Sequence, residues 1–181
     1  MNKLIILIFL VMSFSEDTSR SDQFITRQGQ VSFFSYTSVE NIEAKNNQVL
    51  SIIDLSKGEI AVSMLMNAFV FKKALMHEHF NESYIESDLY PKATFEGRIV
   101  DFDPLADIQT RMIKGNLTIH GIANEVEIKT TIQNNNGSYL FTGDFEATVK
   151  DYDIKIPPIL APNIAKTISI TFRFEYQPYE K

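Results

Sequence analysis

Cysteine is the residue type whose absence says most about this sequence of 181 residues. Without it the chain has no disulfide framework, no thiolate metal site and no cysteine nucleophile, so the core must stabilise the fold unaided. Tryptophan is absent as well, yet the sequence contains 14 phenylalanines. Aromatic mass on that scale predicts a large apolar interior.

Positive charge is also in short supply. The 17 lysines and arginines are outnumbered by 23 aspartates and glutamates, which gives a formal net charge of −6. This balance argues against a nucleic-acid partner and against electrostatic docking on anionic lipid. The sequence also has no glycine-rich phosphate-binding loop, and we therefore expect no nucleotide cofactor.

The sequence opens with one unbroken hydrophobic run, residues 4–12. It is much shorter than the roughly 20 apolar residues that a membrane-spanning helix needs. Lys3 precedes it, and Ser13 and Ser15 put small residues three and one positions before a cleavage point. We therefore expect a secretory signal peptide over residues 1–15, a retained N-terminal anchor being the alternative.

The rest of the sequence has the length of one domain. Residues 16–23 are polar and are expected to form a flexible lead-in, followed by a single domain over residues 24–181. If the signal peptide is removed, this domain is exported, and we expect it to be periplasmic or secreted. No lipid anchor can be attached to it at an N-terminal cysteine.

Alternation is clearest in residues 166–177. Because successive side chains of a strand point to opposite faces, this pattern predicts a strand with one apolar and one polar face. The apolar face carries Ile168, Ile170, Phe172, Phe174 and Tyr176. Similar alternation recurs along most of the sequence and predicts eight or nine antiparallel strands.

Turn and helix signals divide these strands. Gly29, the polar residues 41–47 and a turn at residues 121–124 are expected to interrupt the pattern, and Asn-Asn-Asn-Gly at residues 134–137 predicts a hairpin. Residues 72–84 are the one helical segment, since apolar residues recur there at helical spacing and predict a stripe against the sheet. That stripe consists of Leu75, Met76, Phe80 and Tyr84.

The predicted fold is all-β, a single antiparallel β-barrel of about eight strands with one short helical insertion. A sandwich is the alternative, but the even spacing of the hairpins favours a barrel.

No catalytic or metal-binding set emerges from the titratable residues. His77 and His79 would lie about 200° apart around a helix, too far to share one ion. His120, beside a glycine at a turn, is expected to bond backbone in a tight corner, the alternative being a contact to the head group of a ligand. No Ser-His-Asp set can be placed. We expect no enzymatic activity, no metal site and no cofactor.

Several motifs, in order along the chain, resemble the YceI-like family. Residues 115–122, Gly-Asn-Leu-Thr-Ile-His-Gly-Ile, are similar to its strand ending in a Leu-Thr-x-His-Gly turn. Residues 90–97 look like its Tyr-Pro-x-x-x-Phe segment, and residues 76–82, Met-His-Glu-His-Phe-Asn-Glu, match a helix found in one branch. Asp-Tyr-Asp-Ile at residues 151–154, with Pro157, resembles the segment before the last strand. The resemblance implies an exported, lipocalin-like barrel that binds polyisoprenoids.

An eight-stranded barrel is either filled by side chains or holds one slender ligand. Gly97, Gly115, Gly143 and Ala147 share the apolar parity with large residues, and such small side chains could leave a channel for a lipid tail; the alternative is that they fit the taper of a packed core. The candidate ligand-binding residues are those expected to line the barrel. They are Phe33, Val62, Met64, Phe95, Ile99, Leu117, Ile119, Val126, Ile128, Phe145, Ile170 and Phe172.

Three functional hypotheses follow. In the first, the protein sequesters or carries a polyisoprenoid or another long-chain apolar lipid, without stable membrane insertion. In the second, the apolar face points outward and the chain is an outer-membrane barrel. In the third, the barrel is packed, has no ligand and acts in a stress response or as a scaffold through its outer surface. The sequence leaves open whether two copies form a homodimer.

Overall fold

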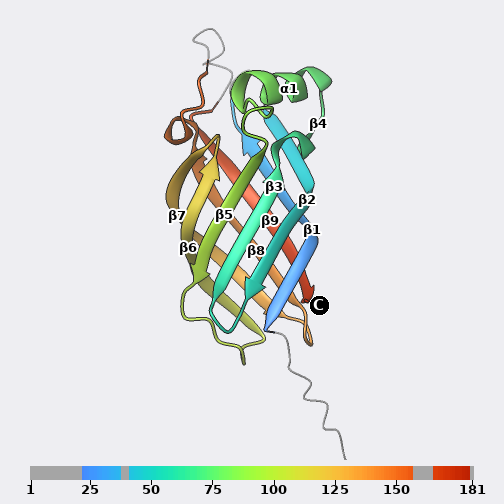
Figure 1. The fold of residues 1–181 in the computed structure, drawn as a ribbon, viewed down its shortest axis with the longest axis vertical. Coiled ribbons are helices and arrows are strands. Elements are labelled where there is room, and N and C mark those ends of the chain that lie inside the picture. The colour runs from blue at the N-terminus through green and yellow to red at the C-terminus, as the bar shows by residue number, and fades with distance from the viewer. Residues whose placement is uncertain (1–21, 38–40, 157–164, 180–181) are drawn as a thin grey trace, which may run out of the picture.

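The computed structural model describes residues 22–37, 41–156 and 165–179. The expected signal peptide, most of the expected lead-in and Pro157 lie outside this part of the chain. Strands dominate the described residues, and one short α-helix is inserted between them (Figure 1). In chain order the strands are β1 (Gln23–Ser35), β2 (Ile42–Asp54), β3 (Glu59–Leu65), β4 (Val70–Phe71), β5 (Lys92–Ile99), β6 (Ile108–Ile119), β7 (Ile122–Asn134), β8 (Tyr139–Thr148) and β9 (Thr167–Pro178), with α1 (Ala74–His79) between β4 and β5.

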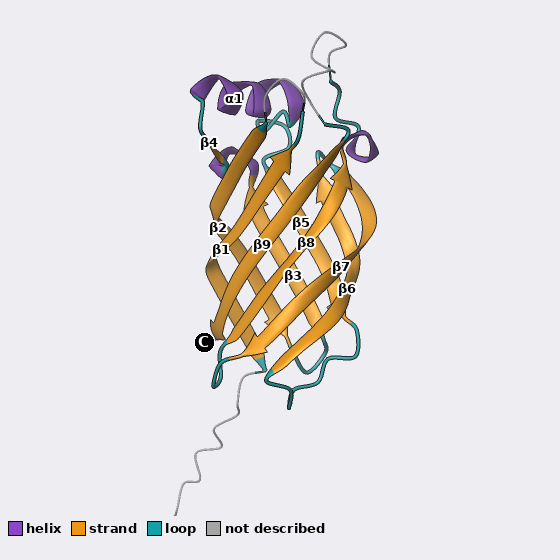
Figure 2. Cartoon of the chain, turned by 180° about the vertical axis from the view of Figure 1, so that it is seen from behind, coloured by secondary structure: helices purple, strands orange, loops and turns teal. Residues whose placement is uncertain are grey.

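All strands except β4 form a closed antiparallel barrel of eight strands. The order around it is β1-β9-β8-β7-β6-β5-β3-β2, and pairing between β1 and β2 closes it (Figure 2). The two-residue β4 pairs with Ala44 and Lys45 of β2. The predicted all-β barrel with a short helical insertion is therefore confirmed.

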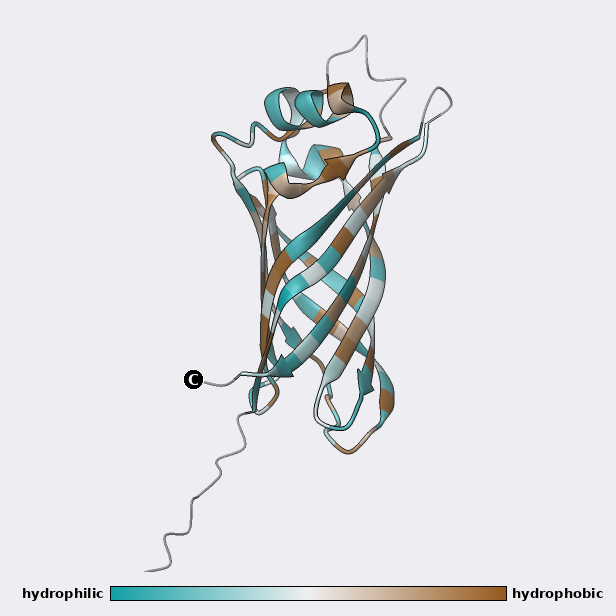
Figure 3. Ribbon diagram, turned by 90° about the vertical axis from the view of Figure 1, so that its right-hand side faces the viewer, coloured by the Kyte–Doolittle hydropathy of each residue, from teal (hydrophilic) through white to brown (hydrophobic). Residues whose placement is uncertain are grey.

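The apolar parity of the strands faces the inside of this barrel. In β9, Ile170, Phe172, Phe174 and Tyr176 are buried, while the alternating threonines, Ser169, Arg173 and Glu175 are exposed. The same exchange of hydrophobic and hydrophilic residues runs along the strands in Figure 3. A barrel that faces lipid has the opposite arrangement, with its apolar band outside. Among the described residues, no helix is long and apolar enough to cross a membrane.

Two predicted interruptions of the strands were wrong. Gly29 lies within the single strand β1, at a bulge where the register with β2 shifts. Most of the interruption expected at residues 41–47 belongs to β2, which begins at Ile42. The strand can continue there because the buried Asn46 has hydrogen-bond partners for both ends of its amide. Its Nδ2 donates to the carbonyl of Leu65 (2.9 Å), and its Oδ1 accepts from the backbone N–H of Gln48 (2.8 Å).

The predicted turn at residues 121–124 is shorter than expected. Ile122 already begins β7, so the connection is the two-residue turn His120–Gly121. Both residues have positive φ, 53° and 75°. This is the backbone that a two-residue hairpin of type I′ requires and that glycine adopts readily.

The helical insertion is also shorter than predicted. The α-helix covers Ala74–His79 and continues as a π-helical turn over Phe80–Tyr84. The segment crosses one end of the barrel (Figure 2). Leu75 of the expected apolar stripe is 60% exposed. We call the end under this segment the mouth.

The opposite end, where the β2–β3 and β7–β8 hairpins lie, is closed by packed side chains. Phe141, Ile53 and Ile132 are almost fully buried, as is Tyr176. The hydroxyl of Tyr176 and the Oγ of Ser51 are 2.6 Å apart, and Ser51 Oγ donates to the carbonyl of Ala61 at 2.9 Å. Since the serine proton is used there, Tyr176 donates its own proton to Ser51, and the buried pair is satisfied.

Candidate ligand-binding cavity

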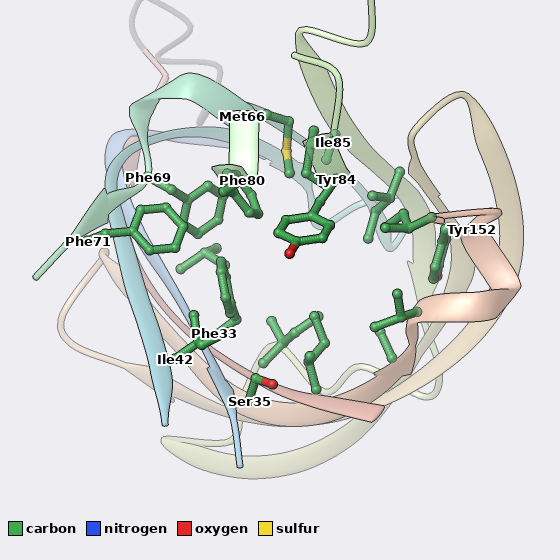
Figure 4. A pocket seen from close by; sticks show the side chains of 18 of the residues that line it. Phe33, Ser35, Ile42, Met66, Phe69, Phe71, Phe80, Tyr84, Ile85 and Tyr152 are labelled. Carbon is green, nitrogen blue, oxygen red and sulfur yellow. The ribbon is translucent and has the colours of Figure 1, made fainter. Parts of the chain in front are cut away.

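A cavity of about 470 Å³ lies inside the mouth of the barrel. Its volume falls within the roughly 300–1,000 Å³ of small-molecule sites, and its lining is mostly aliphatic and aromatic, as in such sites. Figure 4 shows the lining side chains arranged around an open centre. They come from the inner faces of the strands, from residues 66–85, which we call the covering segment, and from residues 149–156 after β8.

Half of the twelve predicted lining residues surround this cavity: Phe33, Met64, Leu117, Ile119, Phe145 and Ile170. Four others, Val62, Phe95, Ile128 and Phe172, line a second cavity of only about 50 Å³. Ile99 is buried and Val126 partly buried, but neither lines either cavity. The large cavity therefore occupies only part of the barrel interior.

The two cavities share a ring of side chains. Its members come from β1, β3, β6, β8 and β9, and they are Val31, Met64, Leu117, Phe145 and Ile170. We call this set the constriction ring. Because it borders the large cavity on one side and the small cavity on the other, it forms the floor of the large cavity.

The glycines of the apolar parity do not open a channel. A Cβ at Gly97 would lie 2.7 Å from the Phe95 ring, and one at Gly143 would lie 2.8 Å from the Phe172 ring. The space beside these two glycines is thus taken by a neighbouring aromatic ring, and a Cβ at Gly115 would meet the backbone of Glu96 and Gly97. Among the small inward residues, Ala93 and Ala147 border the large cavity instead.

The covering segment supplies lining residues that strand parity cannot identify. Met66, Phe69, Phe71, Phe80, Tyr84 and Ile85 all border the large cavity. Phe80 stacks on Phe33 with ring centroids 5.5 Å apart, and it also contacts Phe71 at 5.0 Å and Phe69 at 5.8 Å. The sequence signal that could identify these lining residues was the helical spacing of Met76, Phe80 and Tyr84, which all border the cavity.

Few polar groups reach the cavity. Lys73, His79, Tyr84 and Thr148 border it, and Ser35 does so while its Oγ accepts the backbone N–H of Ala165 at 3.1 Å. Burial raises the pKa of Tyr84. An apolar cavity with a small number of polar groups at its opening suits a ligand that is mostly hydrocarbon.

His120 lies outside the cavity lining and has the structural role expected of it. Its Nδ1 lies 3.2 Å from the carbonyl oxygen of Tyr152, and its Nε2 lies 2.9 Å from Oε2 of Glu86. The Tyr90 ring packs against the imidazole with centroids 4.2 Å apart. His120 thus connects the β6–β7 turn to Glu86, directly after the covering segment, and to the residues that follow β8.

The helix histidines form no metal centre in the described part of the chain. His77 Nε2 lies 3.3 Å from the carbonyl of Asn67. No group of three or more potential metal ligands occurs among the residues that the structure describes.

Comparison with known proteins identifies a matching family and similar structures. The family model of the YceI-like domain matches residues 21–176. A polyisoprenoid binding domain from Saccharophagus degradans, implicated in plant cell wall breakdown, has a similar structure (TM-score 0.75, 14% identity), covering 87% of this chain and 99% of that chain. Among curated proteins, no sequence matches the chain.

Two further solved structures share the fold. BcnA from Burkholderia cenocepacia superposes with a TM-score of 0.69 at 18% identity, covering 81% of this chain and 95% of that chain. The YceI protein of Campylobacter jejuni superposes with a TM-score of 0.66 at 13% identity, covering 80% and 90%. At such identities the likeness concerns the fold. Because the family model spans nearly the whole sequence, the chain belongs to the YceI-like family.

Proposed function

We propose that this protein binds a single polyisoprenoid, or another long apolar chain, in the cavity at the mouth of its barrel. The observation that carries the proposal is the cavity of about 470 Å³, which has a mostly aliphatic and aromatic lining. The structural likeness to a polyisoprenoid binding domain supports it. The mechanism is sequestration, in which no bond is made or broken.

The energetics of such a complex are favourable. Each methylene group moved from water into the cavity contributes about 0.8 kcal/mol. About ten buried carbons would contribute ~8 kcal/mol before ordering costs, which corresponds to roughly micromolar affinity. The exposed polar faces of strands such as β9 would keep the loaded barrel compatible with water.

Export is a second part of the proposal. Its support is the sequence of residues 1–15, a lysine followed by a short apolar run and small residues. Mass spectrometry of the mature protein from its native envelope should give an N-terminus at Glu16. A mature chain that retains Met1 would contradict export by signal cleavage.

The binding proposal is tested by native mass spectrometry of the protein purified from its own envelope, followed by organic extraction. We expect a mass excess that extracts as an isoprenoid or another long-chain lipid. The variant Ala147→Phe places an aromatic ring where Ala147 borders the cavity, and it should bind no lipid. Glu146→Phe is the matched control, because it adds the same ring to the exposed face of β8.

If the wild-type protein has its bare mass, and added isoprenoids neither bind nor raise its melting temperature, the binding proposal is wrong. The barrel would then act through its outer surface, as a scaffold without a ligand. Equal binding by wild-type protein and the folded Ala147→Phe variant would instead exclude this cavity as the binding site.

A further inference from the structure

Tyr84 places a phenol in the opening of an otherwise apolar cavity. It ends the π-helical turn of the covering segment, and its ring projects over the centre of the cavity with the oxygen pointing inward (Figure 4). Its labelled neighbours Ile85 and Phe80 have side chains without a hydrogen-bond acceptor.

Two other tyrosines of the barrel are different. The hydroxyl of Tyr176 is paired with Ser51 at 2.6 Å. Burial and the charge of Asp151 raise the pKa of Tyr152, which also borders the cavity, and the neighbouring side chain of Asn124 partly opposes this shift. In the described part of the chain the Tyr84 hydroxyl has no such partner, and burial alone raises its pKa.

A ligand changes the surroundings of this hydroxyl. In the empty cavity, a water molecule can accept a hydrogen bond from the phenol hydroxyl. An apolar chain that fills the cavity displaces this water, and a buried donor without an acceptor is costly. A ligand that brings its own acceptor oxygen to this place removes that cost, whereas a pure hydrocarbon does not.

We infer that Tyr84 is a ligand-binding residue that donates a hydrogen bond to an oxygen atom at the head of the bound chain. This inference rests on the proposed function and narrows the ligand to an isoprenoid-like chain with an oxygen-bearing head group. The head then lies at the mouth, and the tail runs down toward the constriction ring.

The other polar groups at the mouth are compatible with such a head. Lys73 and His79 border the same cavity and are otherwise exposed at its rim. An uncharged hydroxyl and an anionic phosphate both present acceptor oxygens to Tyr84, but a phosphate also gains from the charge of Lys73. The experiment separates these two sources of the acceptor.

The test compares three probes that share one chain: geranylgeraniol, geranylgeranyl phosphate and the corresponding hydrocarbon without an oxygen. Their affinities are measured by displacement of a fluorescent lipid from wild-type protein and from the variants Tyr84→Phe and Tyr36→Phe. In Tyr84→Phe we expect roughly 3- to 10-fold weaker binding of both oxygen-bearing probes. The hydrocarbon should bind more tightly, because it no longer buries a donor without an acceptor. Tyr36→Phe should leave all three affinities unchanged, because Tyr36 is exposed and borders neither cavity.

The outcomes are distinct. If Tyr84→Phe weakens binding of all three probes equally, or of none, the assigned role of Tyr84 is wrong while the lipid-binding function stands. If the wild-type protein binds none of the probes, the proposed function fails and the inference fails with it. A loss restricted to the phosphate would overturn the inference, since the phenol should serve both acceptors.

Discussion

At the scale of single residues, the closed end of the barrel contains one buried polar pair within an aromatic core. Tyr176 is fully buried beside Phe141, with ring centroids 5.1 Å apart, and its hydroxyl donates to Ser51. Replacing Tyr176 by Phe keeps the ring and removes only this hydrogen bond. The lone pair of Ser51 Oγ that accepts it would lose its partner in a region without solvent.

We therefore expect Tyr176→Phe to lower the free energy of unfolding by about 1–2 kcal/mol. Urea denaturation followed by circular dichroism gives the measurement. Tyr36→Phe is the matched control, because Tyr36 is 73% exposed and its hydroxyl can bond water in both states. Equal stability of wild type and Tyr176→Phe would contradict the importance of the pair.

The same tyrosine predicts a dependence on alkaline pH. Burial raises the pKa of Tyr176 far above its ordinary value, although the hydrogen bond with Ser51 partly opposes this shift. The folded state therefore keeps a proton that the unfolded state loses above about pH 10, so stability is fully present below that pH and declines above it. The decline should be smaller in Tyr176→Phe, as urea unfolding at increasing pH would measure.

Asp54 predicts the converse dependence in acid. A hydrogen bond from Ser56, with smaller contributions from Gln23 and Lys57, lowers the pKa of Asp54 to about 2. The contribution of Asp54 to the free energy of unfolding is present above about pH 4 and is lost as the pH falls through about 2. Asp54→Asn should flatten the loss of stability in this range, measured by thermal unfolding. Asp144→Asn, at an exposed position of β8, is the control and should leave the loss as in wild type.

Residues on strands were the predictable part of the site. Parity alone identified Phe33 and Phe145 as inward, because a strand has only two faces. It could not divide the interior into a hollow and a packed part, since that depends on which rings fill the space beside Gly97 and Gly143. The role inferred for Tyr84 depends on where the helical insertion crosses the barrel, which periodicity does not specify.

At the scale of elements, the covering segment is held by aromatic contacts. Phe80 lies among Phe33, Phe69 and Phe71, while the helix itself has no side-chain N-cap and no buried residue. A helix this short has little stability of its own. Its position over the cavity therefore depends on the packing of Phe80.

Phe80→Ala should loosen this segment without unfolding the barrel. We expect faster amide hydrogen exchange in Ala74–His79 and near-unchanged exchange in β6 and β7, because opening is local. Hydrogen exchange with mass spectrometry resolves the two regions. Leu75→Ala truncates a residue that is 60% exposed on the same helix and should leave the exchange as in wild type. Equal rates in wild type and Phe80→Ala would exclude Phe80 as the anchor.

Strand existence was predictable at this scale, but strand continuity was not. Alternation predicted a strand over residues 166–177, and β9 covers Thr167–Pro178. The break expected at Gly29 is instead a bulge, where a Cβ would lie 2.6 Å from the Phe174 ring of a strand distant in sequence. Likewise, the polar stretch around Asn46 is a strand because the amide finds partners on other residues. Tertiary contacts decided both cases.

At the scale of the whole molecule, the barrel is hollow at its mouth and packed at its closed end. The two expected alternatives for the interior, an open space and a packed core, each describe one part of the barrel. The constriction ring separates the two parts, and Phe145 is its one aromatic member. The depth available to a ligand is therefore set by a few side chains and not by the length of the strands.

Phe145→Ala should join the two cavities and favour longer chains. Each additional methylene that becomes buried would strengthen binding about fourfold relative to wild type. The loss of stability should be below the roughly 3–5 kcal/mol of a fully buried Phe→Ala change, since part of the ring faces the cavity. Affinities for isoprenoid alcohols of increasing length give the measurement.

Phe141→Ala provides the contrast on the same strand. Phe141 lies in the closed end, is fully buried and borders neither cavity. Its truncation should cost the full roughly 3–5 kcal/mol and leave chain-length preference unchanged. If both variants alter length preference alike, the constriction ring is not the floor of the binding site.

The closed end has a consequence for traffic through the molecule. Because the barrel is packed at one end, it has a single opening for ligands. A ligand that enters tail first must therefore leave head first through the same opening. Uptake and release of the ligand would then use the same opening. The protein could not take a ligand from a donor and pass one to an acceptor at the same time. Uptake and release would alternate, and the rate of each would depend on how often the covering segment moves away from the mouth.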